Sequence, residues 1–72
     1  MDIFLLYEYV LDRDENKETF NCVYPYQDKE VALKRIANET GETLDNVKFL
    51  IASGNCVCSG AFVYRLEETE FR

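Results

Sequence analysis

Histidine is absent from this chain, and so is tryptophan. Without histidine the sequence lacks the side chain that serves most often in acid–base catalysis and metal binding. The three glycines are too scattered to form a phosphate-binding loop. Paired carboxylates, such as Asp12 with Asp14 and Glu67 with Glu68, fall in a charged turn and near the end of the chain. Carboxylates in such places are usually solvated, so we predict that the protein is not an enzyme, has no catalytic residues and binds no cofactor.

Cysteine is scarce, and the three cysteines are an odd number, which argues against a closed set of disulfides. Cys22 together with Cys56 and Cys58 offers three thiolates on neighbouring predicted strands. A structural zinc site usually has four ligands and a spacing of two residues between paired cysteines. We therefore predict three free thiols, no bound metal and a reducing compartment.

Long apolar runs are missing as well. The apolar run at the start of the sequence is short and carries no basic leader, so we expect no signal peptide, no membrane span and a cytoplasmic location. Basic side chains are few, with eight Lys and Arg against fourteen Asp and Glu, and the net charge is −6. Such a charge repels nucleic acid and attracts a basic protein surface. The other interpretation is that it only keeps a small protein in solution.

The sequence does contain strand and helix patterns within one predicted domain, residues 1–72. Two segments rich in β-branched and aromatic residues, Ile3–Leu11 and Thr19–Tyr26, predict an antiparallel hairpin around a polar turn. Residues after Asn55 predict a C-terminal strand or hairpin. With two helices between these parts, the predicted fold class is α+β in the order ββααβ(β), a small antiparallel sheet packed on a helix pair.

The two predicted helices have recognisable caps. Asp28 is a good N-cap for the first, and Gly41 is suited to end it. Thr43 is suited to cap the second, whose apolar positions fall within one arc at 100° per residue. Because short apolar runs are ambiguous, Val47–Ala52 also fits a strand, although period and cap favour the helix. The predicted core consists of Leu5, Tyr7, Phe20, Cys22, Leu33, Ile36, Val47, Leu50, Phe62 and Tyr64.

The segment 36–50 has the spacing of a helix-turn-helix unit. Ala37 is small enough to let two helices cross closely, Gly41 allows a tight turn, and Val47 and Leu50 pack the second helix on the first. This segment, with the strands on either side, resembles small helix-turn-helix proteins that are common in bacteriophage genomes. The resemblance implies DNA binding through the second helix. An ordinary pair of antiparallel helices has the same apolar spacing.

The outward positions of the second helix depart from the DNA-binding pattern. They are Glu42, Asp45, Asn46 and Phe49, which include two carboxylates and no arginine. An aromatic ring among acidic groups is more typical of a protein interface, so we predict these four residues as a partner-binding site, unless Phe49 belongs to the core. The expected partner is a protein with a basic surface, and free nucleic acid and membrane are not expected.

Three functions remain open at this stage. The first is a phage or mobile-element protein that inhibits a host nucleic-acid-handling or defence nuclease by occupying its basic channel. The second is a helix-turn-helix transcriptional regulator, and the third is an assembly subunit that uses the aromatic first strand. The transcriptional regulator is expected to be a homodimer.

Overall fold

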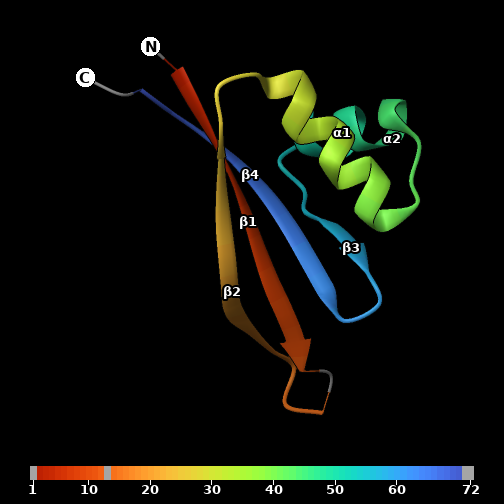
Figure 1. Ribbon diagram of the computed structural model, residues 1–72. Coiled ribbons are helices and arrows are strands. Elements are labelled where there is room, and N and C mark those ends of the chain that lie inside the picture. Colours follow the sequence, from red (N-terminus) through yellow and green to blue (C-terminus); the bar gives the residue numbers. More distant parts are fainter. Residues whose placement is uncertain (1, 13, 71–72) are drawn as a thin grey trace.

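The computed structural model describes residues 2–12 and 14–70. The fold is α+β, with a four-stranded antiparallel sheet and two helices in the order ββααββ (Figure 1), which confirms the predicted class. The strands are β1 (Asp2–Asp12), β2 (Lys17–Tyr26), β3 (Val57–Ser59) and β4 (Phe62–Glu70), and the helices are α1 (Lys29–Thr40) and α2 (Leu44–Ala52). The second helix excludes the strand interpretation of Val47–Ala52.

The sheet has the order β2-β1-β4-β3, so the first strand is central and pairs on both sides. Both helices lie on one side of this sheet, as Figure 1 shows. The third strand is short and pairs only with the first residues of β4, from Phe62 to Tyr64. The outer edge of β4 is therefore covered by strand pairing at one end only.

The caps predicted from the sequence are present. The Asp28 carboxylate accepts a hydrogen bond from the backbone N–H of Glu30, and Thr43 Oγ1 accepts one from the N–H of Asn46. Between the helices, Gly41 has φ 75°, a left-handed conformation that costs little without a Cβ. These local interactions determine where α1 ends and where α2 begins.

A cluster of buried side chains fills the space between the helices and the sheet. Leu33, Ile36, Val47 and Tyr64 belong to it, as predicted, and Leu50 packs against it. Leu6 and Val57 also belong to the cluster, although they were not among the predicted core residues. Ala32 is buried as well, and so is Val63, which by strand register lies on the Tyr9 side of the sheet.

Several predicted core residues lie elsewhere. Phe20 is 54% exposed and Phe62 is 42% exposed. Leu5, Tyr7 and Cys22 are half-buried. For the first strand, the prediction placed the wrong face against the helices. Leu6 faces the helices. Leu5 and Tyr7 face the other way, because alternate residues of a strand point to opposite faces.

Candidate functional site

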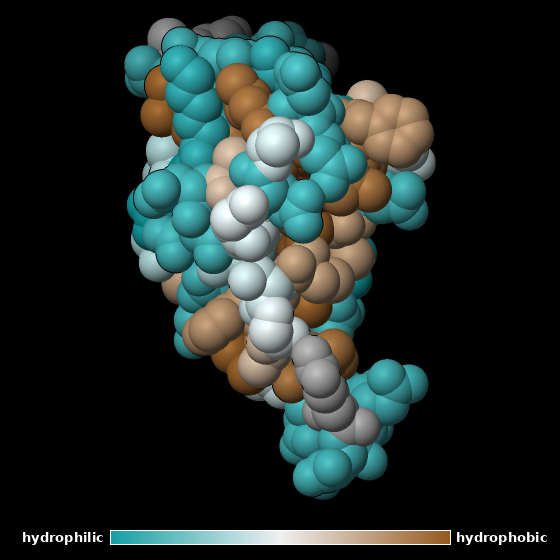
Figure 2. All heavy atoms as spheres, turned by 90° about the vertical axis from the view of Figure 1, so that its right-hand side faces the viewer, coloured by the Kyte–Doolittle hydropathy of each residue, from teal (hydrophilic) through white to brown (hydrophobic). Residues whose placement is uncertain are grey.

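The outward surface of α2 is built by a short, capped helix. Val47 is fully buried, and Leu44, Leu50 and Ile51 pack against the core from the same helix. Because the helical period places these four on one arc, the opposite arc faces solvent. Figure 2 shows the helical side of the molecule, where hydrophilic side chains surround apolar ones that reach the surface.

Three of the four residues predicted from the sequence, Asp45, Asn46 and Phe49, lie on this outward arc, and Glu42, which precedes the N-cap, is joined to them by its hydrogen bond with Asn46. Glu42, Asp45 and Asn46 are exposed, and the Phe49 side chain is 67% exposed. Phe49 follows Asp45 by four positions and Asn46 by three, which places all three side chains on one helix face. The interpretation of Phe49 as a core residue is therefore wrong. We call Glu42, Asp45, Asn46 and Phe49 the acidic α2 surface.

One hydrogen bond connects two polar side chains of the acidic α2 surface. Asn46 Nδ2 donates a hydrogen bond to Glu42 Oε2 at 2.6 Å, so this amide is engaged with a carboxylate. The nearest basic side chain along the helix, Lys48, forms an ion pair with Glu30 at 3.0 Å. The surface thus presents an aromatic ring beside two carboxylates.

Basic side chains are distributed over several elements of the described structure. Besides the Lys48 pair, Arg35 pairs with Glu39 at 3.2 Å and Arg65 pairs with Glu18 at 2.9 Å. One of these ion pairs lies within α1, one joins α1 to α2, and one crosses the sheet from β2 to β4. Such an arrangement differs from the clustered cationic stripe that favours nucleic-acid binding.

Comparison with protein-family models, curated proteins and solved structures finds no match to this chain. In the described ranges, neither helix has the length and apolar content needed to cross a membrane. Within the same ranges, no group of three or more potential ligands is placed to hold a metal ion.

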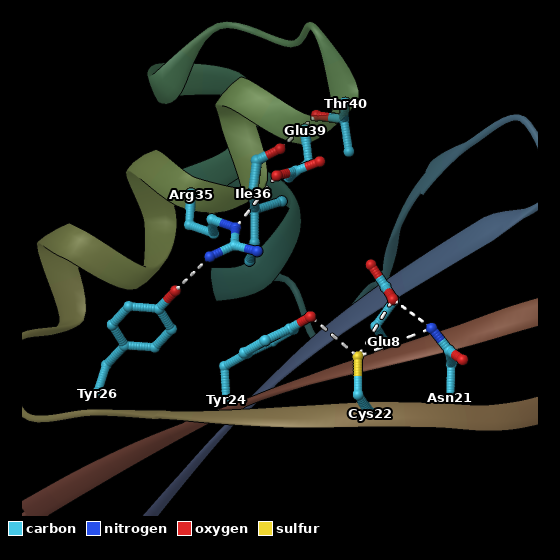
Figure 3. A network of polar contacts seen from close by, with 9 residues as sticks. All are labelled: Glu8, Asn21, Cys22, Tyr24, Tyr26, Arg35, Ile36, Glu39 and Thr40. Atoms are coloured by element: carbon cyan, nitrogen blue, oxygen red, sulfur yellow. Dashed lines mark hydrogen bonds and ion pairs between the residues drawn. The ribbon is translucent and has the colours of Figure 1, made fainter.

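A polar network lies on the helix-facing side of the sheet (Figure 3). Glu8 accepts hydrogen bonds from Asn21 Nδ2 at 2.6 Å and from the Cys22 thiol at 3.2 Å. The Cys22 thiol also lies 3.2 Å from the Tyr24 hydroxyl. Burial raises the pKa of Glu8, but hydrogen bonds from Asn21, Cys22 and Tyr64 outweigh that effect, and the net pKa is lowered. Glu8 is thus held as a carboxylate at neutral pH.

Arg35 joins this network to the first helix. Its guanidinium lies 4.7 Å from the centre of the Tyr24 ring and donates a hydrogen bond to the Tyr26 hydroxyl at 3.3 Å. Burial raises the pKa of Tyr64 to about 12, with a further contribution from its hydrogen bond to Glu8. The network connects β1, β2, β4 and α1, which is a structural role.

A second surface lies on the side of the sheet away from the helices, on the aromatic first strand that the assembly hypothesis names as an interface. Tyr7, Tyr9 and Phe20 form a ring cluster there, with centroids 6.0 to 6.5 Å apart. By strand register, Ile3, Leu5 and Val23 share this side. We call these six residues the open sheet face. In the described part of the chain both helices lie on the other side, so these apolar groups stay partly exposed.

Proposed function

We propose that this chain is a non-enzymatic acidic binding protein that acts by contact with a protein partner through the acidic α2 surface. The observation that carries the proposal is the 67% exposure of Phe49 on a capped helix whose apolar arc is supplied by other residues. Phe49 is the most exposed of the large apolar residues among those that the structure describes, and covering such a ring with another surface is favourable because it removes apolar area from water. Aromatic anchors of this kind, surrounded by polar groups, dominate the energy of many interfaces.

The chemistry of the surroundings favours a basic partner. Asp45 lies one helical turn from Phe49, Glu42 is joined to the same surface by its hydrogen bond with Asn46, and the whole chain carries a net charge of −6. Such charges steer a basic surface into contact and raise the association rate at low salt. The proposed mode of action is inhibition of a nucleic-acid-handling enzyme, such as a host defence nuclease, by competition for its basic channel. A phage or mobile-element origin accords with this mode and rests on the sequence resemblance alone.

The alternative, a DNA-binding regulator that reads bases through α2, has weaker support. Asn46 is the one residue of the acidic α2 surface suited to an adenine edge, and its amide donates to Glu42. Both carboxylates of that surface would face phosphates. A positively charged protein would instead be attracted to the same two carboxylates.

The test compares the proteins that three immobilised variants retain from a bacterial lysate. Phe49→Ala is expected to keep the fold and to lose basic proteins that the parent retains. Val31→Ala is the matched control, because Val31 is a 49% exposed apolar residue on the other helix. Glu42→Lys combined with Asp45→Lys is expected mainly to slow association with a retained partner, in a salt-dependent way.

If Phe49→Ala retains the same basic proteins in the same amounts as Val31→Ala, the acidic α2 surface is not the contact. For a retained nuclease, inhibition by the parent and loss of inhibition by Phe49→Ala are expected. Retention without any effect on cleavage would contradict the inhibitory mode.

The open sheet face favours a second candidate function, self-assembly. With eleven residues in β1, strand spacings give a flat footprint of about 36 by 14 Å for the three long strands, about 500 Å² on each copy. Two copies face to face bury about 1,000 Å², the lower limit for a specific interface. The occupant proposed is therefore a second copy of this chain.

Charge also favours a second copy on this face. Strand alternation places Glu18, Arg65 and Glu67 there, and Arg65 pairs with Glu18 at 2.9 Å. The face is therefore nearly neutral although the chain is acidic, and two copies can approach it with little repulsion. Sedimentation equilibrium is expected to give a dimer for the parent and for Val31→Glu, and a monomer for Phe20→Glu. A parent that stays monomeric at millimolar concentration would exclude this function.

A further inference from the structure

Two thiols lie close together where the chain leaves α2 and enters β3. The Sγ atoms of Cys56 and Cys58 are 3.8 Å apart. Residues two apart in an extended chain point to the same side, and the residue between them points to the other. Val57, between the two cysteines, is only 1% exposed and belongs to the core cluster. The anchored Val57 side chain therefore directs both thiols away from the core.

The two thiols differ in their surroundings. Cys56 is half-buried and lines a hollow of about 460 Å³ beside the outer edge of β4, together with Tyr7, Tyr9 and Arg65. Cys58 as a whole is exposed. Its sulfur is nevertheless partly shielded from water, and this partial burial, together with the hydrogen bond with Cys56, raises the pKa of the Cys58 thiol. Cys58 therefore keeps its proton at neutral pH, while Cys56 faces a space large enough for a small molecule.

We propose that Cys56 and Cys58 form a redox-active dithiol that reacts reversibly with low-molecular-weight disulfides, of which glutathione disulfide is the test compound. The proposal is independent of partner binding through the acidic α2 surface. The hollow shares Tyr7 and Tyr9 with the open sheet face, so the reaction is assigned to the monomer, in which this face is uncovered. It assigns the first attack to Cys56, which lines the hollow, and the second to Cys58, which is the resolving thiol.

The reaction proceeds in two exchanges. The Cys56 thiolate attacks one sulfur of the small disulfide, a protein–small-molecule disulfide forms, and one small thiolate leaves. Cys58 then loses its proton to water and attacks Cys56 Sγ, which forms the intramolecular disulfide and expels the second small thiolate. Both thiolates take up protons, so one small disulfide becomes two small thiols while the protein dithiol loses two hydrogens.

The geometry also explains why the reaction should be reversible. Bond formation shortens the Sγ–Sγ distance from 3.8 Å to about 2.05 Å. Cys58 is held by pairing with Val63, and Val57, between the two cysteines, is held by the core. A disulfide closed against such restraints is strained, and strained disulfides are reduced easily.

The experiment incubates the reduced full chain with graded ratios of glutathione disulfide to glutathione. The samples are quenched with acid, alkylated and measured by intact mass. Oxidising ratios are expected to yield a species that is lighter by two hydrogens and carries one alkyl group, which peptide mapping assigns to Cys22. Return to a reducing ratio is expected to restore three alkyl groups.

Variants separate the assigned roles. Cys58→Ser is expected to stop at a glutathione adduct on Cys56, and Cys22→Ser is expected to behave like the parent. Circular dichroism of each variant verifies the fold. Three alkyl groups at every ratio, or glutathione adducts in the parent without the intramolecular disulfide, would overturn the proposal. If Cys58 in Cys56→Ser forms its glutathione adduct faster than Cys56 does in Cys58→Ser, the assignment of the first attack would also be overturned.

Discussion

Phe20 and Cys22 lie on opposite faces of the sheet although only one residue separates them. Cys22 pairs with Glu8 and Phe20 pairs with Tyr9, two consecutive residues of β1, so Asn21 is the extra residue of a β-bulge. The bulge sends Phe20 to the ring cluster with Tyr9, while Cys22 stays under α1 in the polar network. Asn21 lies at the bulge, and its side-chain amide donates a hydrogen bond to Glu8.

Replacing Asn21 by Ala tests the role of this bulge contact. The hydrogen bond from Asn21 helps to lower the pKa of Glu8, so Asn21→Ala is expected to raise that pKa and to cost about 1 kcal/mol of stability at neutral pH. A lowered folded-state pKa stabilises the fold above the ordinary value of 4.5, and that stabilisation is lost as the pH falls through the folded value. Urea unfolding should therefore show that the difference in stability between the parent and Asn21→Ala becomes smaller as the pH falls through the acid range. A stability difference that does not change with pH would contradict the role of Asn21 in lowering the pKa of Glu8.

Tyr64 should control stability on the alkaline side. Its pKa is raised from 10.0 to about 12, so the folded state keeps the phenol proton at a pH where the unfolded chain has released it. The corresponding stabilisation is complete below pH 10 and is lost as the pH rises towards 12, with a magnitude on the order of 2 kcal/mol. The stability difference between the parent and Tyr64→Phe is expected to fall across this window. An unchanged difference would show that Tyr64 titrates normally.

The core can be tested with one substitution and one control. Ile36 is fully buried between the helices and the sheet, so Ile36→Ala is expected to cost about 2–5 kcal/mol. Val31→Ala, on the exposed side of the same helix, is expected to change stability by less than about 0.5 kcal/mol. If the denaturant midpoints of Ile36→Ala and Val31→Ala agree within error, the assignment of Ile36 to the core is contradicted.

Random duplex DNA is not expected to bind at physiological salt. Neutralisation of phosphates requires clustered cations, whereas the chain has a net charge of −6, and three of its eight basic residues, Arg35, Lys48 and Arg65, take part in ion pairs. An electrophoretic mobility assay should show no shift at sub-micromolar protein. A shift that weakens steeply with added salt would contradict this prediction.

The thiols and metal content of the reduced protein form the last prediction. Titration in denaturant is expected to give three thiol equivalents, one for each cysteine of the sequence. Elemental analysis is expected to find no stoichiometric zinc. Retained zinc, with loss of the fold on chelation, would reverse the assignment.

The acidic α2 surface and both helix boundaries could be predicted from the sequence because their causes are local. Asp28 and Thr43 cap helices within three residues of themselves, and Gly41 supplies the turn conformation. The position of Phe49 outside the apolar arc follows from a period of 3.6 residues. No distant contact is needed for any of these features.

Tertiary structure alone decided which side of the sheet the helices cover. Both sides of β1 are apolar, with Leu6 on one and Leu5 and Tyr7 on the other, so alternation could not choose between them. The helices settle on the side where Leu6 and Tyr64 complete the core, and the bulge at Asn21 keeps Phe20 on the opposite side. Strand side chains have no preferred face until another layer packs on one of them, because the exclusion of water is a property of the assembled layers.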